Sequence, residues 1–213
     1  MEKLTLNTLP QNKVKHPQHI ICVPASVVEH RANGLVDYQL TNADLTIKRR
    51  HELEDSFDYR QVLALVVFTY HGKVWAYERT DSGGEDDLHN KVAVLVGGHW
   101  DFGDLVHFDS VIDVAASEQA ALERELREEV VVTSSILSKK EMPLKICADD
   151  EPVDRKHMCT VFHVELDGEG LAANTNDEDL KDIGFIDPEE LLAGPYNLET
   201  WARITCEQLI KAS

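Results

Sequence analysis

Cysteine is scarce in this chain, and its spacing limits the kinds of site that the protein can contain. The 213 residues include four cysteines, and no two of them form a Cys-x-x-Cys pair; they are Cys22, Cys147, Cys159 and Cys206. This spacing argues against zinc knuckles and thioredoxin-like redox sites, and disulfide frameworks are typical of smaller secreted domains. We therefore expect reduced, partly buried thiols and a cytoplasmic protein.

Basic residues are few relative to acidic ones. Lysine and arginine number 21 against 39 aspartates and glutamates, which gives a formal net charge of −18. Nucleic acids and anionic membrane surfaces are bound through basic surfaces, so this balance argues against both as partners. An acidic protein can still bind an anionic small molecule if a metal ion held by carboxylates offsets the repulsion.

Long apolar runs are also lacking. No run approaches the roughly 20 residues needed to span a bilayer, and the polar start from Met1 to Lys15 lacks the apolar core of a signal peptide. Hydrophobic residues still make up 43% of the chain, an ordinary value for a protein that buries a core. The length predicts one large domain, or one domain with an extension.

Hydrophobic patterning predicts interleaved strands and helices after residue 60. Two apolar runs, Val62–Tyr70 and Lys73–Tyr77, flank a His71-Gly72 turn and indicate a β-hairpin. Further predicted elements are strands Val92–Val96, Leu144–Cys147 and Met158–Leu166, and helices over 114–132, from Asp187-Pro188 and over Leu198–Lys211. This order favours an α/β sandwich with a mixed sheet. We expect residues 1–60 to be an N-terminal extension packed on a core domain of residues 61–213.

The predicted helix over 114–132 carries several acidic side chains. Glu125, Glu128 and Glu129 are three and four residues apart and therefore share one face, and Glu118 is predicted on the same side. Crowded carboxylates repel one another, and a cation such as Mg²⁺, which binds a few carboxylates together with water and phosphate, relieves that repulsion. Glu/Arg-rich helices are usually only solvated faces. The Gly97-Gly98 loop upstream favours the metal-binding interpretation.

The stretch from residue 97 to 132 resembles the signature of the Nudix hydrolases. That signature is Gly, five residues, Glu, seven residues, then Arg-Glu-apolar-any-Glu-Glu-any-Gly-apolar. In this chain Gly98 is followed after five residues by Asp104, the run from Arg124 to Glu129 matches the second half, and Val132 matches the closing apolar position. The wider pattern resembles a bacterial subgroup of predicted Nudix phosphoesterases, on Gln61, Gly83-Gly84-Glu85 and Gly97-Gly98-His99.

The chain departs from this signature at three points. Asp104 replaces Glu, and Val131 replaces a Gly, so the turn after the helix must be built differently because Val resists positive φ. Residues 105–123 make nineteen positions where the family has seven. Because long loops in compact domains are usually functional or disordered, we expect residues 105–116 to form an ordered flap near the site.

The resemblance implies a Nudix-type α/β/α sandwich. It also implies that the protein hydrolyses a P–O–P linkage and that this activity depends on Mg²⁺, with Mn²⁺ as a substitute. The implied substrate is a nucleoside diphosphate linked to another group. The implied metal ligands are Glu125, Glu128, Glu129, Asp104 and the Gly98 carbonyl, with Arg124, Glu125 and Glu128 as catalytic residues. Arg79, His99, Glu178 and Asp179 are candidate substrate contacts, although surface charge, a structural histidine and an acidic loop are the respective alternatives.

Two other functions stay open at this stage. The first is a non-catalytic Nudix module that binds a nucleotide or a partner as a regulator. The second is the isomerase branch with a Nudix-like fold, which acts on isoprenoid diphosphates and needs a catalytic Cys paired with a Glu. No cysteine lies near the signature here, which disfavours the isomerase. We expect a small-molecule diphosphate as the partner, no nucleic acid and no membrane, and a homodimer is compatible with the sequence.

Overall fold

The computed structural model describes residues 18–28, 34–81, 88–143, 145–174 and 180–212. The strands are β1 (His19–Pro24), β2 (Leu35–Val36), β3 (Thr46–Arg49), β4 (Tyr59–Tyr70), β5 (Lys73–Arg79), β6 (Val92–Ala93), β7 (Leu95–His99), β8 (His107–Phe108), β9 (Val111–Ile112), β10 (Val130–Val132), β11 (Ile136–Glu141), β12 (Lys145–Ile146), β13 (His157–Leu166), β14 (Leu171–Ala173) and β15 (Leu180–Ile186). The helices are α1 (Arg50–Leu53), the 3₁₀ turn η2 (Phe102–Asp104), α2 (Val114–Glu129), α3 (Pro152–Arg155), α4 (Pro188–Ala193) and α5 (Thr200–Ala212).

Strand β4 runs through the centre of the main sheet. The sheet order is β15-β5-β4-β13-β12-β2, and β4 is parallel to β13 but antiparallel to β5 and β7. The predicted turn between β4 and β5 is confirmed, since His71 and Gly72 have φ values of 48° and 77°, as a tight hairpin turn requires. The sheet is therefore mixed, as the sequence predicts.

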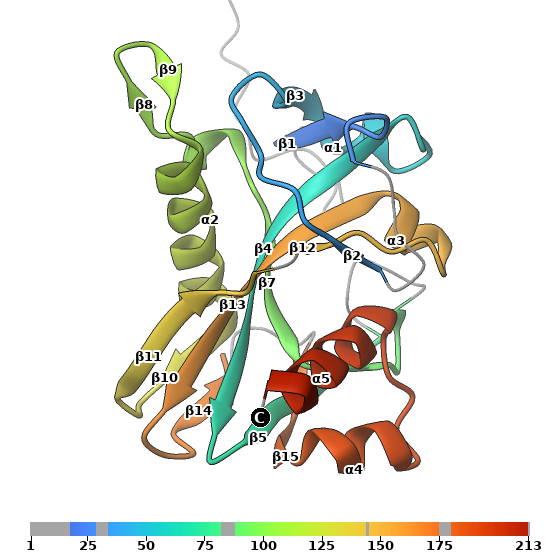
Figure 1. The fold of residues 1–213 in the computed structure, drawn as a ribbon, viewed down its shortest axis with the longest axis vertical. Coiled ribbons are helices and arrows are strands. Elements are labelled where there is room, and N and C mark those ends of the chain that lie inside the picture. Colours follow the sequence, from blue (N-terminus) through green and yellow to red (C-terminus); the bar gives the residue numbers. More distant parts are fainter. Residues whose placement is uncertain (1–17, 29–33, 82–87, 144, 175–179, 213) are drawn as a thin grey trace, which may run out of the picture.

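Helices cover both faces of this sheet, with α2 on one side and α4 and α5 on the other (Figure 1). Alternate residues of β4 divide between the two cores because successive strand side chains point to opposite faces. Val66 and Phe68 pack in the cluster that includes Leu122 of α2, and Val67 packs in the cluster that includes Ile204 of α5. The expected α/β/α sandwich is confirmed.

The hairpin of β4 and β5 opens away from its turn. The two strands pair at Thr69–Val74 and Tyr70–Lys73, and farther along β4 pairs with β7 while β5 pairs with β6. This separation lets the glycine end of β7 lie beside Ala64 in the middle of β4. The sheet thereby carries the Gly97-Gly98 segment to the C-terminal half of α2.

The N-terminal segment contributes strands to the same sheet. Strand β1 pairs with both β3 and β4, with Cys22 opposite Gln61, and β2 pairs with β12. Ile21 and Val23 are buried in the same cluster as the core of β4. A domain boundary at residue 60 stays a prediction, and residues 1–17 lie outside the described part of the chain.

Helix α2 is shorter than the sequence predicts. The Asp113 side chain caps its start by accepting a hydrogen bond from the Ala116 amide at 3.0 Å. The helix ends at Glu129, and Val130 has an extended backbone with φ −134° and ψ 156°. The prediction of helix through residue 132 is wrong at these last positions, because three consecutive β-branched valines pair as β10 with β14. Val131 therefore lies in a strand, and no glycine turn is needed there.

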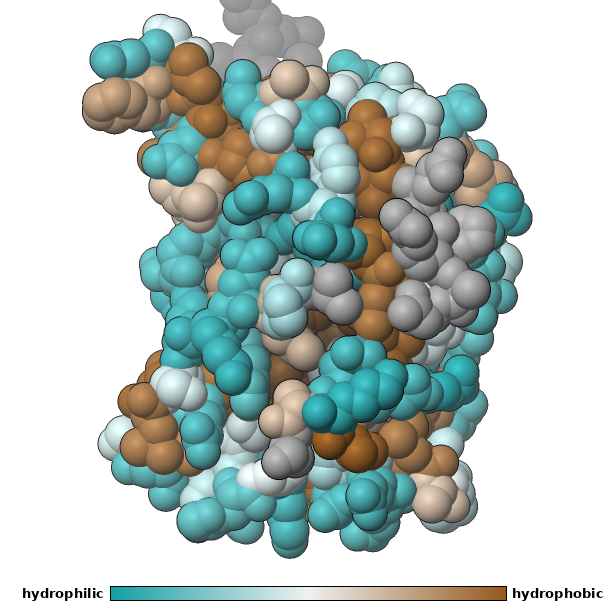
Figure 2. Space-filling view, in the orientation of Figure 1, coloured by the Kyte–Doolittle hydropathy of each residue, from teal (hydrophilic) through white to brown (hydrophobic). Residues whose placement is uncertain are grey.

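Residues 105–116 include a small hairpin at the start of α2. Strands β8 and β9 pair with each other, and the turn between them consists of Asp109 and Ser110, which have positive φ values of 47° and 69°. The hairpin projects from the N-terminal end of α2, and its Phe108 is 74% exposed (Figure 1). Figure 2 shows hydrophobic residues at this hairpin at the upper left, over β10 and β11 at the lower left, and in a band down the right of centre, on a face that is otherwise largely hydrophilic.

None of the helices in the described ranges is both long and apolar enough to cross a membrane.

Candidate functional site

A cavity of about 470 Å³ lies between the C-terminal half of α2, the glycine end of β7 and the first residues of α3 and α5. Strand β4 contributes Leu63 and Leu65 to its lining, and β5 contributes Arg79. Its volume is in the range of small-molecule binding sites, roughly 300–1,000 Å³. Of the sequence-predicted site residues, those that line it are Arg79, Gly98, His99, Arg124, Glu125, Glu128 and Glu129.

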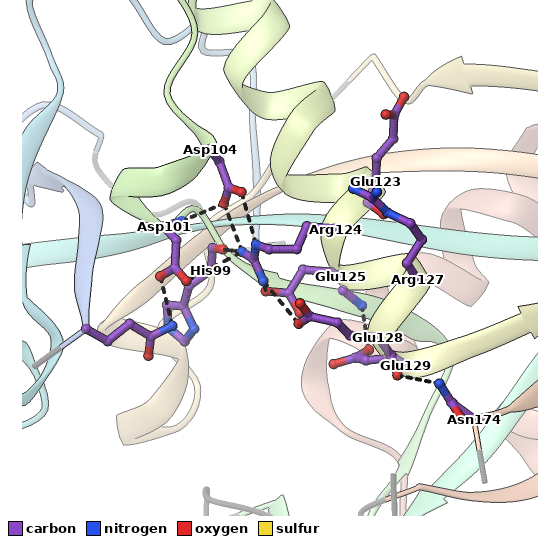
Figure 3. Close-up of polar contacts among 12 residues, drawn as sticks. His99, Asp101, Asp104, Glu123, Arg124, Glu125, Arg127, Glu128, Glu129 and Asn174 are labelled. Atoms are coloured by element: carbon purple, nitrogen blue, oxygen red, sulfur yellow. Dashed lines mark hydrogen bonds and ion pairs between the residues drawn. The ribbon is translucent and has the colours of Figure 1, made fainter. Parts of the chain in front are cut away.

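Arg124 is the centre of the polar network at this cavity (Figure 3). Its Nε and Nη2 donate to the two carboxylate oxygens of Asp104 at 3.0 and 2.8 Å, and Nη2 also donates to the His99 carbonyl at 2.9 Å. Its Nη1 donates to Glu125 at 2.8 Å and to Glu128 at 3.3 Å. The hydrogen bonds with Asp104 are the largest influence that raises the pKa of the Arg124 guanidinium above its ordinary value. Arg124 thus fixes two acidic side chains of its own helix against the loop after β7.

Glu125 is held directly against the glycine segment. A Cβ atom placed on Gly98 would lie 2.7 Å from the Glu125 carboxylate, so a side chain at this position cannot coexist with the observed Glu125 position. Burial raises the pKa of Glu125, Arg124 opposes that rise, and the nearby charge of Glu128 adds to it. The site therefore contains a buried carboxylate whose ionised form is poorly solvated, which is the environment that a cation stabilises.

Glu125, Glu128 and Glu129 of α2 together form an acidic wall of the cavity. Glu129 Oε2 accepts a hydrogen bond from the Gly97 amide at 3.0 Å, whereas the Glu128 side chain is 61% exposed. Asn174 anchors the end of the helix: its side-chain Nδ2 donates to the Glu128 backbone carbonyl at 3.0 Å, and its backbone N–H donates to the Glu129 backbone carbonyl at 2.7 Å. Both carboxylates consequently border the same cavity as Glu125.

The donor set suits a hydrated divalent cation but is not preassembled. Within the described ranges, no three His, Cys, Asp or Glu side chains are grouped closely enough to hold a metal ion. Glu125, Glu128 and Glu129 still supply oxygen ligands to one cavity, together with the backbone at Gly98. Mg²⁺ usually keeps several waters and uses one or two carboxylates plus substrate phosphates, so these residues fit it in chemistry.

Asp104 lies apart from this acidic wall. It is 7% exposed, both of its oxygens accept from Arg124, and Oδ2 also accepts from the Asp101 amide at 2.8 Å. It does not line the cavity, whereas Asp101 does. These contacts favour a positioning role over direct metal binding. The metal-ligand assignment of Asp104 stays a prediction without support from its contacts.

Glu118 is separated from the other acids of α2. It is 7% exposed and lies beside Lys145, outside the cavity lining. Burial raises its pKa, and the charge of Lys145 opposes that rise. Glu118 shares the inward side of the helix with Glu125, but seven residues advance about 10.5 Å along a helix axis. Glu118 therefore lies on the predicted side of the helix but too far along its axis to line the cavity.

The predicted flap does not border the cavity. No residue between 105 and 116 is part of the lining, because the β8–β9 hairpin leaves the fold at the far end of α2 (Figure 1). The segment is ordered as expected, but its expected position near the site is wrong. Twelve additional residues were accommodated by extending outward before α2 rather than by folding over its acidic end.

The candidate substrate contacts divide into three outcomes. Arg79 lines the cavity and is already paired with Glu199 of the segment before α5. His99 also lines it, and its ring meets the His157 ring edge-on with centroids 5.4 Å apart. Glu178 and Asp179 lie outside the described residues. Their assigned roles stay predictions.

Several residues that line the cavity were not predicted from the sequence. They lie on the wall opposite α2 and are Glu151, Asp154, His157, Glu199, Thr200 and Trp201. The Glu151-Pro152-Val153-Asp154 start of α3 is a readable helix-start signal, with a capping box between Glu151 and Asp154. That signal indicates a local turn and carries no information about which cavity the turn faces.

Comparison with known proteins gives a partial sequence match and a fold match. No protein-family model matches the chain. Protein YmaB of Bacillus subtilis is 34% identical over 88 residues, which span 39% of this chain and 38% of that protein. The solved structure of Tm1382, a protein assigned provisionally to the Nudix hydrolases, matches with a TM-score of 0.69 and 19% identity over 92% of this chain and 100% of that one. A NUDIX-family hydrolase from Clostridium perfringens matches with a TM-score of 0.42 and 13% identity over 72% of this chain and 97% of that one. With its mixed sheet, its flanking helices and its likeness to Tm1382, this chain has the fold of the Nudix hydrolases.

Proposed function

We propose that this protein is a Mg²⁺-dependent hydrolase that cleaves the P–O–P linkage of a nucleoside diphosphate joined to another group, with Mn²⁺ as a substitute. The observation that carries the proposal is the Arg124 network. One guanidinium holds Glu125 and Glu128 in place at a cavity that Glu129 and Gly98 also line. The Nudix fold supports a hydrolase of this general type.

The charges of the cavity explain why a cation is needed. Its acidic residues, among those described, are Asp101, Glu125, Glu128, Glu129, Glu151, Asp154 and Glu199. Its arginines each form an ion pair: Arg50 with Glu54, Arg79 with Glu199, and Arg124 with Asp104. A diphosphate would meet mostly negative charge there, and a divalent cation reverses the sign of that interaction.

Each residue of the acidic wall has a separate task in this proposal. A bound divalent cation supplies neutralisation of phosphate charge and a more acidic water molecule. Arg124 bonds Oε1 of Glu125, so Oε2 can accept a hydrogen bond from the attacking water and orient it. Gly98 keeps the approach to that carboxylate open, because any side chain there would occupy the same space.

The test is the substitution Glu129→Gln, assayed on a panel of diphosphates with Mg²⁺ and with a chelator. Glutamine preserves an oxygen that can accept from the Gly97 amide but removes a charged ligand. Activity should fall about a hundredfold or more, since each ~1.4 kcal/mol of lost transition-state stabilisation is a factor of ten. The melting temperature should change little.

The matched control is Glu123→Gln. Glu123 is on the same helix but exposed, and it does not line the cavity. Its substitution should leave activity within about twofold of wild type. Activity that survives both the chelator and Glu129→Gln would contradict the proposed chemistry.

A second candidate is a module that binds a nucleotide without cleaving it. It is favoured by the lack of a preassembled metal cluster in the described ranges, where Arg124 already engages Glu125 and Glu128. The same panel separates the two functions. A nucleotide that raises the melting temperature while no diphosphate is cleaved would establish the binding module.

A further inference from the structure

The cavity continues from the acidic wall of α2 to a second wall built by α3 and α5. Glu125 lies against Gly98, and the ring of His99, the residue after Gly98, meets the ring of His157 edge-on. A ring nitrogen of His157, Nδ1, lies 2.7 Å from the Val153 carbonyl in α3, and Val153 is followed by Asp154. Asp154 therefore lies across the cavity from the carboxylates of α2.

Among the described residues, Asp154 has hydrogen-bond acceptor positions that no other group of the protein fills. It is 5% exposed yet lines the cavity, its Oδ2 accepts from the Glu151 amide at 3.1 Å, and the Thr200 hydroxyl is its other hydrogen-bond partner. An ionised carboxylate offers about four acceptor positions, so about two remain for a ligand. Burial raises the pKa of Asp154 to about 6, as expected for a carboxylate with incomplete solvation.

The surroundings of Asp154 suit the flat, largely apolar faces of a heterocycle. The large apolar residues of the cavity lining are Leu63, Leu65, Leu88, Leu95, Val153, Leu180 and Trp201. The indole Nε1 of Trp201 is buried and makes no hydrogen bond to any described part of the chain. Trp201 follows Thr200, the hydrogen-bond partner of Asp154, and both Trp201 and Asp154 line the cavity.

We propose that this second wall binds the nucleobase of the substrate and that Asp154 selects guanine. The inference rests on the proposed function, because it assigns the organic half of the diphosphate cleaved at α2. Guanine presents two adjacent donors, N1–H and the 2-amino group, which match two carboxylate acceptors as a charge-assisted pair.

The other bases fit this wall less well. Adenine places the N1 acceptor beside its amino group, and cytosine places the N3 acceptor beside its own, so each sets a lone pair against the carboxylate. Uracil offers one N–H between two carbonyl oxygens. The diphosphate itself is disfavoured at this wall, because Glu151 and Asp154 would repel it. The phosphates are therefore assigned to the acidic helix with its cation, and the base to α3 and α5.

The first test measures binding of guanosine and adenosine by calorimetry, without metal, to wild type and to Asp154→Asn. Wild type should bind guanosine about tenfold or more tightly than adenosine, the discrimination that one bidentate contact gives. Asparagine replaces two acceptors by one acceptor and one donor, which match adenine. Asp154→Asn should therefore lose the preference for guanosine and bind adenosine at least as tightly as it binds guanosine.

The matched control is Asp149→Asn. Asp149 pairs with Arg155 at 2.8 Å near the same helix but is not part of the cavity lining. Its substitution should leave the guanosine preference unchanged, and thermal melts of both variants establish that they are folded. Failure of wild type to bind guanosine at millimolar concentration, a preference for adenosine, or a preference that Asp154→Asn does not alter overturns the assignment.

A second measurement separates this inference from the proposed function. Wild type and Asp154→Asn are each assayed, with Mg²⁺, for cleavage of esters of guanosine diphosphate and of adenosine diphosphate. If guanosine binds in an Asp154-dependent way while no ester is cleaved, the proposed hydrolysis fails and the base assignment stands. If both esters are cleaved equally by wild type and by Asp154→Asn, the hydrolysis stands and the base assignment fails.

Discussion

Arg124 and Asp104 form a two-point ion pair, with Nε on Oδ1 at 3.0 Å and Nη2 on Oδ2 at 2.8 Å. The pair joins α2 to η2 across the segment that contains the projecting hairpin. A planar guanidinium held at two points has its remaining nitrogen directed by geometry, and here Nη1 reaches Glu125 and Glu128. Asp104 therefore acts on the acidic wall through Arg124, without lining the cavity itself.

The substitution Asp104→Asn tests this positioning role. It removes the charge that holds Arg124, so we expect activity to fall at least tenfold and the free energy of unfolding to fall by about 1–3 kcal/mol. Activity assays and denaturant unfolding measure the two effects. Asp109→Asn, on the exposed hairpin tip, is the control and should change neither. Full activity in Asp104→Asn would show that Arg124 is held in place by its other contacts.

Gly98→Ala should reduce activity with little loss of stability. The added methyl would lie 2.7 Å from the Glu125 carboxylate, so that side chain must move. Misplacement of a catalytic group by about 1 Å can cost about a hundredfold in rate. Gly103→Ala is the matched control, since a methyl there meets nothing within 4 Å. Comparable kcat/KM values for the two variants would argue against a role for the Glu125 position.

Asp154→Asn should stabilise the protein in a pH-dependent way. The pKa of Asp154 is raised from 3.8 to about 6 in the folded state. The folded protein therefore binds more protons than the unfolded one in this window, and stability falls as pH rises from about 4 to 6. The full penalty, up to about 3 kcal/mol, is present above pH 6. The variant should be close to wild type at pH 4 and more stable at pH 7.5 by denaturant unfolding. A stability difference that is the same at both pH values would contradict this prediction.

Glu118→Gln should leave activity unchanged. Glu118 is outside the cavity lining, its Oε1 makes no hydrogen bond within the described chain, and burial raises its pKa despite the charge of Lys145. A neutral side chain removes the cost of burying a charge, and Lys145 keeps its pair with Glu141 at 3.0 Å. We expect kcat/KM within about twofold of wild type and equal or higher stability at pH 7.5. A loss as large as that of Glu129→Gln would place Glu118 in the catalytic group.

Local patterns in the sequence determined the framework of this protein. The apolar run of β4 and the His71-Gly72 turn predicted the hairpin, because strand burial and turn conformation depend on neighbouring residues. The spacing of Glu125, Glu128 and Glu129 placed three carboxylates together, because helix geometry repeats every 3.6 residues. Glu118 shares the predicted side of the helix, but only the fold shows that the cavity extends no farther along α2 than the Glu125 end.

Tertiary structure alone decided which distant segments meet. The pairing of Asp104 with Arg124, and the wall formed by Asp154 and Thr200, depend on how α2, α3 and α5 pack on the sheet. The end of α2 was also decided this way, because the three valines of Val130–Val132 favour a strand locally but only the fold supplies their partner, Leu171–Ala173. Such contacts join residues far apart in the chain, so their energies depend on the whole fold rather than on the periodicity of any one segment.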